Sequence, residues 1–344
     1  MNVQNQAHGD NWTMYHNDCI PVVEALPENS LDFSVYSPPF EGLYIYSESE
    51  ADMGNSGSME EFLDHYEYLV NGLYRATVPG RLTAVHVKDL PLYKNSSGWF
   101  GIEDFSGLVS LIHRKAGWVL QSRITIWKDP VIEMEKTNSH GLLHKNFGQR
   151  TQVVRVGLPD YVLVFAKPDP ESMGKDISQL RKPGDYIGTN PPKLHEYLSS
   201  FRTRKPDWYT GTVEEYNYSI AVWQRYASPV WFDIDQTDVL NYRVAKDSKD
   251  EKHICPLQLG VIRRCVDMWT NPGETVFTPF AGIGSEVVTA VEMGRKGIGA
   301  ELKESYFKQA VKFCKEAEVK AARPNFFNLV DQQDIATQSP MAGD

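Results

Sequence analysis

The chain of 344 residues is long enough for one large domain that carries an insertion. Its apolar and charged contents are those of an ordinary soluble enzyme, and no apolar run is long enough to cross a bilayer. The polar start of the chain lacks a signal peptide, and the four cysteines show no CxxC spacing. We therefore expect a protein of the reducing cytoplasm, with no membrane partner and no metal site. Because the net charge is −10, contact with nucleic acid would need a local basic face.

The first informative segment runs from residue 17 to residue 40. Asn17-Asp18-Cys19 precedes a short amphipathic helix predicted at 20–26, and residues 31–36 form a predicted buried strand. Ser37-Pro38-Pro39-Phe40 follows at once, and two prolines cannot extend a strand. The turn is either a plain strand end or a rigid holder. In the second case it fixes the Ser37 hydroxyl and the Pro38 carbonyl beside an aromatic ring, at the sheet edge where α/β folds bind ligands.

The middle of the chain supplies the next elements. Ser58-Met59-Glu60-Glu61 is a capping box that opens a helix, and residues 105–116 form another helix. Strands are predicted at 82–87, 119–127 and 161–165, and His86 in the first of them is assigned a structural role. The glycine-bearing loop 41–57 is a candidate cover for a site.

The second informative segment is a predicted strand–turn–helix–strand unit at residues 274–301. Gly282 and Gly284 lie in the turn, a helix begins at Ser285, and Glu301 stands at the tip of the last strand. Glycines allow a close backbone approach, and a carboxylate in this place can bind ribose hydroxyls. Val287 occupies the place of a third glycine, which argues against a dinucleotide. On this pattern alone, a nucleotide site and a tightly turned unit without a ligand both stay open.

Together the two segments resemble the DNA methyltransferases that act on exocyclic amino groups. Ser37-Pro38-Pro39-Phe40 resembles the (D/N/S)PP(Y/F/W) tetrapeptide of that family, and residues 280–284 resemble its FxGxG cofactor loop. The tetrapeptide precedes the loop, as in the β class. Residues 17–19 resemble the "GDC" segment, with Asn17 in place of the usual Gly, and residues 253–257 resemble the segment that leads into the loop.

This resemblance implies a fold and a cofactor. The fold is a Rossmann-like α/β class I methyltransferase, with a mostly parallel seven-stranded sheet, an antiparallel end strand and an inserted target-recognition region. The cofactor is S-adenosylmethionine. By the same resemblance, the cofactor-binding residues are Asp18, Cys19, Cys255, Pro256, Leu257, Pro279, Phe280, Ala281, Gly282, Gly284, Ser285 and Glu301.

The catalytic residues implied by the resemblance are Ser37, Pro38, Pro39 and Phe40. An exocyclic amine is a poor nucleophile because its lone pair is delocalised into the ring. Hydrogen-bond acceptors at the Ser37 hydroxyl and the Pro38 carbonyl would localise that lone pair, and Phe40 would stack on the flipped base. In the family, Ser at the first position is found mostly with N4 of cytosine, and Asp or Asn with N6 of adenine. The sequence favours N4-cytosine, with N6-adenine as the alternative.

Residues 168–252 lose regular periodicity and are either a loosely packed insertion or a target-recognition region. In the second case, cations contact phosphates and side chains read base edges of double-stranded DNA. The candidate DNA-binding residues are Lys193, Arg202, Arg204, Lys205, Trp208 and Tyr209. Asn190-Pro191-Pro192-Lys193 has no preceding strand and no aromatic fourth residue, so it is not a second catalytic turn. Residues 1–167 and 253–323 would form the catalytic and cofactor-binding parts, and 324–344 a polar tail. A companion restriction endonuclease and a homodimer are both open.

Three other functions fit the sequence less well. C5-cytosine methylation needs a Pro-Cys nucleophile turn, whereas Cys255-Pro256 has the reverse order, so we reject it. A protein-glutamine methyltransferase uses a similar turn, but its cofactor loop comes first in the chain. An inactive nucleic-acid-binding module should lose the tetrapeptide or the glycines, and both are intact.

Overall fold

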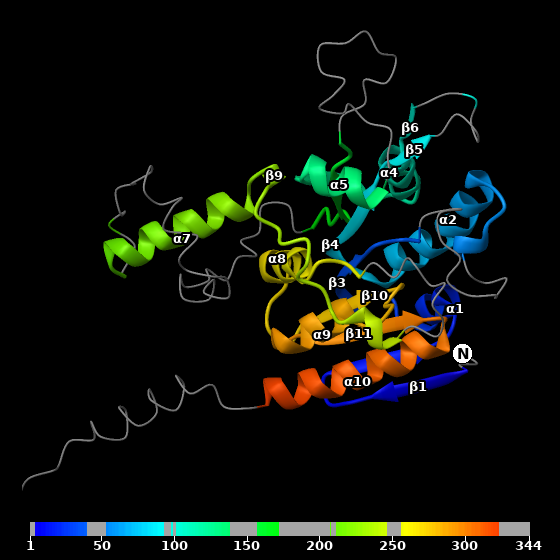
Figure 1. The fold of residues 1–344 in the computed structure, drawn as a ribbon. Helices are drawn as coiled ribbons and strands as arrows, with labels where there is room; N and C mark the ends of the chain where they lie inside the picture. Colours follow the sequence, from blue (N-terminus) through cyan, green and yellow to red (C-terminus); the bar gives the residue numbers. More distant parts are fainter. Residues whose placement is uncertain are drawn as a thin grey trace, which may run out of the picture.

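The protein is built around one mixed sheet with helices on both faces (Figure 1). In this computed structural model, the residues described are 4–39, 53–92, 98, 101–137, 157–171, 207, 211–245 and 256–322. From one edge to the other, the sheet contains β1 (Asn5–His8), β2 (Trp12–His16), β11 (Lys296–Glu301), β10 (Thr275–Thr278), β3 (Leu31–Tyr36), β4 (Thr77–Lys88), β8 (Asp160–Ala166), β7 (Val119–Ile126) and β9 (Val230–Trp231). A separate antiparallel pair is formed by β5 (Leu90–Leu92) and β6 (Gly101–Glu103).

The strands of the large sheet are mostly parallel. β2, β11, β10, β3 and β4 pair in parallel with one another, in that order across the sheet. β8 is antiparallel to both β4 and β7. β9 is parallel to β7, and β1 is antiparallel to β2. The predicted class I methyltransferase sheet corresponds to the central strands β2 to β7. Within the described residues, the sheet is longer than predicted by one strand at each edge.

Two layers of helices cover the sheet (Figure 1). Each helix packs into a buried cluster with residues of the strands that it covers. One face is covered by α1 (Cys19–Ala25), α2 (Met59–Ala76) and α4 (Phe105–Lys115), and the other by α8 (Leu259–Trp269), α9 (Ser285–Glu292) and α10 (Glu304–Ala321). The other helical elements are α5 (Pro130–Thr137), α7 (Val213–Tyr226) and the short 3₁₀ turns η1 (Met53–Asn55) and η4 (Tyr242–Ala245).

Capping side chains set where the helices of the first layer begin. The Asp18 carboxylate accepts a hydrogen bond from the Ile20 amide at 3.0 Å, and the Ser58 hydroxyl accepts one from the Glu61 amide at 3.1 Å. The Glu61 carboxylate accepts from the Gly57 amide at 2.7 Å, one residue earlier than a capping box predicts. The predicted helices at 20–26 and 105–116 and the predicted strand at 31–36 are confirmed, with bounds that shift by at most one residue.

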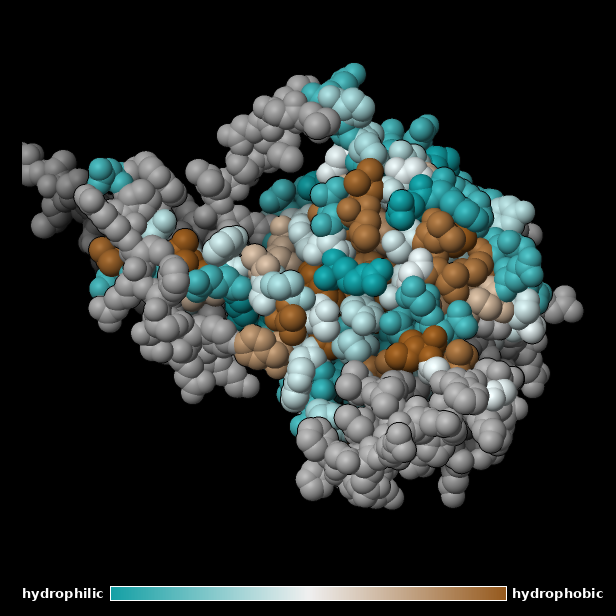
Figure 2. All heavy atoms as spheres, turned by 90° about the horizontal axis from the view of Figure 1, so that it is seen from above, coloured by the Kyte–Doolittle hydropathy of each residue, from teal (hydrophilic) through white to brown (hydrophobic). Residues whose placement is uncertain are grey.

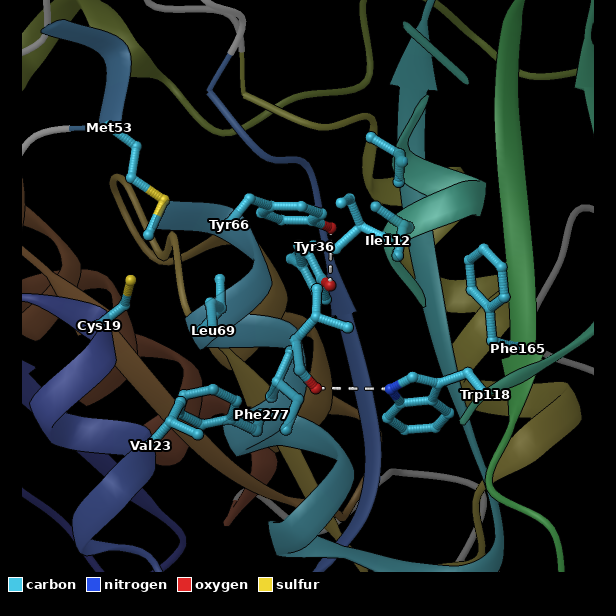
Figure 3. Close-up of a cluster of buried hydrophobic side chains, with 14 of the residues drawn as sticks. Cys19, Val23, Tyr36, Met53, Tyr66, Leu69, Ile112, Trp118, Phe165 and Phe277 are labelled. Carbon is cyan, nitrogen blue, oxygen red and sulfur yellow. Dashed lines mark hydrogen bonds between the residues drawn. The ribbon is translucent and has the colours of Figure 1, made fainter. Parts of the chain in front are cut away.

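A buried polar network lies in the core at the end of β3, just before the Ser37-Pro38-Pro39 turn. The hydroxyl of Tyr36, the last residue of β3, is 3.0 Å from the Tyr66 hydroxyl (Figure 3). It is also 3.2 Å from Nε2 of His113. Burial lowers the pKa of His113 to about 4, against a hydrogen bond with the Val109 carbonyl. The ring is therefore neutral at ordinary pH. This network fixes the end of β3 before the chain enters the Ser37-Pro38-Pro39 turn.

The surface is mixed in character. On the face seen from above, hydrophobic residues form several separate patches between hydrophilic ones (Figure 2). The exposed large apolar side chains include Trp127, Trp223 and Phe232, around the β7–β9 edge of the sheet and on α7. β9 belongs to this sheet although it lies within the predicted insertion 168–252.

Candidate active site at the carboxyl edge of the sheet

The segments singled out in the sequence meet at one edge of the sheet. β2, β11, β10, β3 and β4 run parallel, so their carboxyl ends lie together, and antiparallel β8 begins at the same edge. β10 leads through α9 to β11 on one side, whereas β3 leads through α2 to β4 on the other. The sheet therefore has its topological switch point between β3 and β10, where open α/β sheets bind ligands.

The turn after β3 places Ser37 next to a histidine of the neighbouring strand. Tyr36 of β3 pairs with Val85 of β4, so the following residues, Ser37 and His86, stand side by side. The Ser37 hydroxyl oxygen lies 3.3 Å from Nδ1 of His86. Pro38 and Pro39 are buried behind the hydroxyl, and Ser37 itself is partly exposed. The hydroxyl is thus held at the surface of a rigid turn.

His86 is held in turn by a carboxylate of a third strand. Nε2 of His86 lies 3.1 Å from Oδ2 of Asp160, at the start of β8. Nζ of Lys128 is 2.5 Å from the same oxygen, and Nζ of Lys88 is 4.0 Å from Oδ1. Burial raises the pKa of Asp160, but the hydrogen bond from His86 and the two nearby ammonium groups outweigh it and hold the pKa well below its ordinary range. We call the group of Ser37, His86 and Asp160 the Ser37 cluster.

The loop between β10 and α9 (279–284) is shaped by its glycines. Gly282 and Gly284 have φ values of 53° and 93°, in the left-handed region that favours glycine. The Ala281 amide donates to the Ala300 carbonyl at 2.9 Å, and the Gly284 amide donates to the Ala281 carbonyl at 2.7 Å. A Cβ at Gly284 would lie 3.1 Å from that of Ala310, so α10 packs closely there. At Gly282 a Cβ would meet nothing within 4 Å, so the loop borders open space that a ligand can occupy.

Glu301 closes this loop from the tip of β11. Its Oε2 accepts a hydrogen bond from the Gly282 amide at 2.7 Å, and its Oε1 accepts one from the Lys303 amide at 2.8 Å. A carboxylate has about four acceptor positions, so both oxygens can accept further bonds from a ligand. The carboxylate, the open space at Gly282 and the partly buried ring of Phe280 border the same loop. This arrangement fits a ligand with hydroxyl groups and a flat ring.

Asp18 and Cys19 lie at the carboxyl end of β2, beside Glu301. The Asn17 amide donates to the Glu301 carbonyl at 3.1 Å, and Asp18 caps α1. Burial and the neighbouring Asp18 carboxylate raise the pKa of the Cys19 thiol. Cys19 is therefore a neutral, buried side chain and not a nucleophile.

The remaining predicted site residues have mixed outcomes. Pro279 is buried in the β10–α9 loop, and Ser285 is buried as the first residue of α9. Leu257 packs into the core beside α8, while Pro256 is half-buried. Phe40 and Cys255 lie outside the described residues, as do all six candidate DNA-binding residues, Lys193, Arg202, Arg204, Lys205, Trp208 and Tyr209. Within the described ranges, no three His, Cys, Asp or Glu side chains are grouped so as to hold a metal ion. No helix there combines the length and the apolar character needed to cross a membrane.

The sequence matches a family model described as DNA methylase, for N6- and N4-methyltransferases, over residues 31–312. This match includes both the Ser37 turn and the β10–α9 loop. The chain belongs to the DNA methylase family. The predicted family, that of the DNA methyltransferases acting on exocyclic amino groups, is thereby confirmed.

Two curated relatives are type II methyltransferases of archaea. M.MjaI of Methanocaldococcus jannaschii is 23% identical over 233 residues, which cover 68% of this chain and 61% of the relative. M.MthZI of Methanothermobacter thermautotrophicus is 29% identical over 141 residues, or 37% of this chain and 38% of the relative. The chain thus matches less than two thirds of the length of either relative.

Solved structures show the same fold. The DNA modification methylase TTHA0409 of Thermus thermophilus, complexed with S-adenosyl-L-methionine, aligns with a TM-score of 0.56 at 20% identity, covering 89% of this chain and 96% of that one. The cytosine-N4-specific PvuII DNA methyltransferase aligns with a TM-score of 0.53 at 16% identity, covering 98% and 96%. The predicted class I methyltransferase fold is confirmed.

Sequence reasoning missed part of the site. It gave His86 a structural role and did not single out Asp160 or Lys88. The structure places His86 against the Ser37 hydroxyl, Asp160 against His86, and Lys88 and Lys128 against Asp160. No motif contains them, because they come from three strand ends that are far apart in the chain. One signal was present: buried polar residues at the ends of strands that meet at the ligand-binding edge.

Proposed function

We propose that this protein transfers a methyl group from S-adenosylmethionine to the exocyclic amine of a base flipped out of double-stranded DNA. N4 of cytosine is the favoured acceptor and N6 of adenine the alternative. The observation that carries the proposal is the position of the Ser37 hydroxyl. It lies on a rigid turn after β3 at the switch point of a DNA methylase sheet, and the neighbouring strand β10 leads into the loop that Glu301 closes.

S-adenosylmethionine supplies a methyl group on a sulfonium. The protein's part is to bind this donor and to place the acceptor amine. Glu301 would accept hydrogen bonds from the ribose hydroxyls, and the backbone of 280–284 would surround the methionine part. Asp18 would lie near the adenine amine. Each assignment agrees with the place of the residue at the carboxyl edge of β2, β10 or β11.

At the acceptor, the amine has to be turned into a nucleophile. The Ser37 hydroxyl and the Pro38 carbonyl would each accept one amino hydrogen, which favours a tetrahedral nitrogen with a localised lone pair. Phe40 would stack on the flipped base. Apposition of the nitrogen and the methyl group supplies much of the remaining rate.

The preference for cytosine rests on Ser37. A serine hydroxyl is a weaker acceptor than a carboxylate, and Ser at this position is the residue that resembles the N4-cytosine enzymes. The direct test is to methylate DNA with the purified enzyme and to identify the product nucleoside by mass spectrometry. N4-methylcytosine is expected. N6-methyladenine alone would overturn the choice of base, and no methylated nucleoside at all would overturn the activity.

The DNA contact is proposed for the basic and aromatic residues between 193 and 209. Charge reversal at Arg202, Arg204 and Lys205 should weaken DNA binding and flatten its salt dependence, because fewer counterions would be released. Binding of S-adenosylmethionine should not change. An unaltered salt slope would place the contact elsewhere. A companion endonuclease, a homodimer and the division of the chain at 168 and 252 stay predictions.

A further inference from the structure

The Ser37 hydroxyl is one end of a hydrogen-bonded row that crosses three strands. Ser37 follows β3, His86 lies in β4 and Asp160 begins β8. The two links measure 3.3 Å and 3.1 Å and use the two different ring nitrogens of His86. The His86 and Asp160 side chains are 11% and 6% exposed, whereas Ser37 is partly exposed. The row therefore runs from the site into the protein.

The charges around Asp160 fix its end of the row. Lys128, after β7, and Lys88, in β4, both contact the Asp160 carboxylate, and Glu133 of α5 lies 2.5 Å from Nζ of Lys88. The two ammonium groups of Lys88 and Lys128 thus face the two carboxylates of Asp160 and Glu133, and these four charges sum to zero. Asp160 stays ionised and can only accept hydrogen bonds.

The direction of each hydrogen bond follows. Because the Asp160 carboxylate can only accept, Nε2 of His86 must carry the hydrogen of that bond. In a neutral imidazole the other nitrogen is then an acceptor, so Nδ1 accepts from the Ser37 hydroxyl. The hydrogen of Ser37 is therefore directed at His86, and its lone pairs are left for another donor. A serine without such a partner could equally turn its hydrogen toward the incoming amine.

We propose that His86, held by Asp160, is a positioning residue that keeps the Ser37 hydroxyl oriented as an acceptor for the amine to be methylated. This inference rests on the proposed function. It assigns His86 no contact with the base and no part in binding the methyl donor. It also explains how a neutral hydroxyl can serve where related turns use a carboxylate, which needs no orientation because both of its oxygens accept.

Two substitutions at His86 separate its two bonds. In His86→Asn the side-chain oxygen lies near the place of Nδ1, so an acceptor for Ser37 is kept. In His86→Gln the amide nitrogen lies near the place of Nε2, so the bond to Asp160 is kept and the acceptor is lost. We expect His86→Gln to lower kcat by about 10- to 100-fold and His86→Asn to retain most of it. KM for S-adenosylmethionine should stay unchanged in both.

A purely structural role predicts a different outcome. It would make both variants lose stability and activity together, or neither. In a Ser37→Ala background, His86→Gln should have no further effect on kcat, because the hydroxyl that it orients is gone. An equal loss in the presence and absence of the Ser37 hydroxyl would overturn the proposal. Thermal unfolding of each variant shows whether it has folded.

A measurement on the unaltered protein tests the same point without DNA. With ¹⁵N-labelled histidine, NMR distinguishes a ring nitrogen that carries hydrogen from one that accepts, and the His86 signals are assigned by their loss in His86→Asn. We expect hydrogen on Nε2 and an accepting Nδ1. Hydrogen on Nδ1 would overturn the proposal even if the enzyme methylates DNA. Conversely, a failure to methylate any base would refute the proposed function and leave this result intact.

Discussion

In the β10–α9 loop, the ligand-facing geometry comes from the backbone of one continuous segment, whereas in the Ser37 cluster it comes from side chains on three strands. The loop needs two glycines at positive φ and one carboxylate that accepts from the Gly282 amide. The cluster needs β3, β4 and β8 in register, so that Ser37, His86 and Asp160 meet. A change in the loop should therefore act on cofactor binding, and a change in the cluster on the methyl-transfer step.

The largest expected effect is that of Ser37→Ala. Removing the acceptor should lower kcat by about 10²- to 10³-fold, the usual effect of losing one directed hydrogen bond in an active site. The affinity for S-adenosylmethionine, measured by calorimetry, should be unchanged. The matched control is Ser30→Ala. Ser30 directly precedes the first residue of β3, at the end of the strand away from Ser37, and this variant should be fully active. A cofactor affinity that falls together with kcat would show that the two regions are not separate.

Glu301→Gln is the corresponding change on the cofactor side. The amide keeps one acceptor oxygen but loses the charge, and hydrogen bonds to charged groups are the stronger ones. We expect a loss of about 10- to 100-fold in affinity for S-adenosylmethionine, which is about 1.4 to 2.8 kcal/mol. Glu304→Gln is the control, since Glu304 is exposed and forms an ion pair with Lys308 at 2.7 Å within the helix. Calorimetry on both variants decides, and equal affinities would remove Glu301 from the site.

The two loop glycines should differ in their effect on stability. Gly284→Ala puts a Cβ 3.1 Å from the Ala310 Cβ and 3.3 Å from its Cα, at a φ of 93°. Gly282→Ala meets open space and has only the strain of a φ of 53°. Overpacking adds to backbone strain only at Gly284, so we expect losses of about 2 to 4 kcal/mol there and about 1 kcal/mol at Gly282. Urea unfolding measures both, and a larger loss at Gly282 would contradict this account.

These differences also explain what the sequence could and could not predict. The β10–α9 loop was predicted residue by residue because its glycines and Glu301 belong to one local unit, and local spacing is visible in a sequence. The central strands and helices were predicted for the same reason. The contact between His86 and Asp160 was not predicted, since the two residues meet only through the pairing of β4 with β8, in which His86 stands opposite Val162 and Lys88 opposite Asp160. The extra edge strands β1 and β9 have four and two residues, too short for a periodic signal.

Glu286 offers the most specific test, because it lies in the first turn of α9, next to the loop, yet is buried. Burial raises the pKa of its carboxyl to about 8, against a backbone hydrogen bond, and the negative charge of Glu301 adds to the increase. The ordinary pKa is 4.5, so between this value and about 8 the folded protein holds a proton that the unfolded chain has released. The contribution to stability is full below pH 4.5 and is lost as the pH rises through about 8.

Glu286→Gln removes this titration while keeping the shape of the side chain. The free energy of unfolding of the unaltered protein should fall relative to that of the variant by at most about 1.4 kcal/mol per pH unit across this range. Urea unfolding of both proteins from about pH 5 to about pH 9 measures the difference directly, and other titrating groups cancel because the two chains share them. Glu316→Gln, at an exposed position of α10, should give a curve parallel to that of the unaltered protein. If the Glu286→Gln curve is parallel as well, Glu286 is ionised in the folded protein, and the region behind the loop is more polar than its burial indicates.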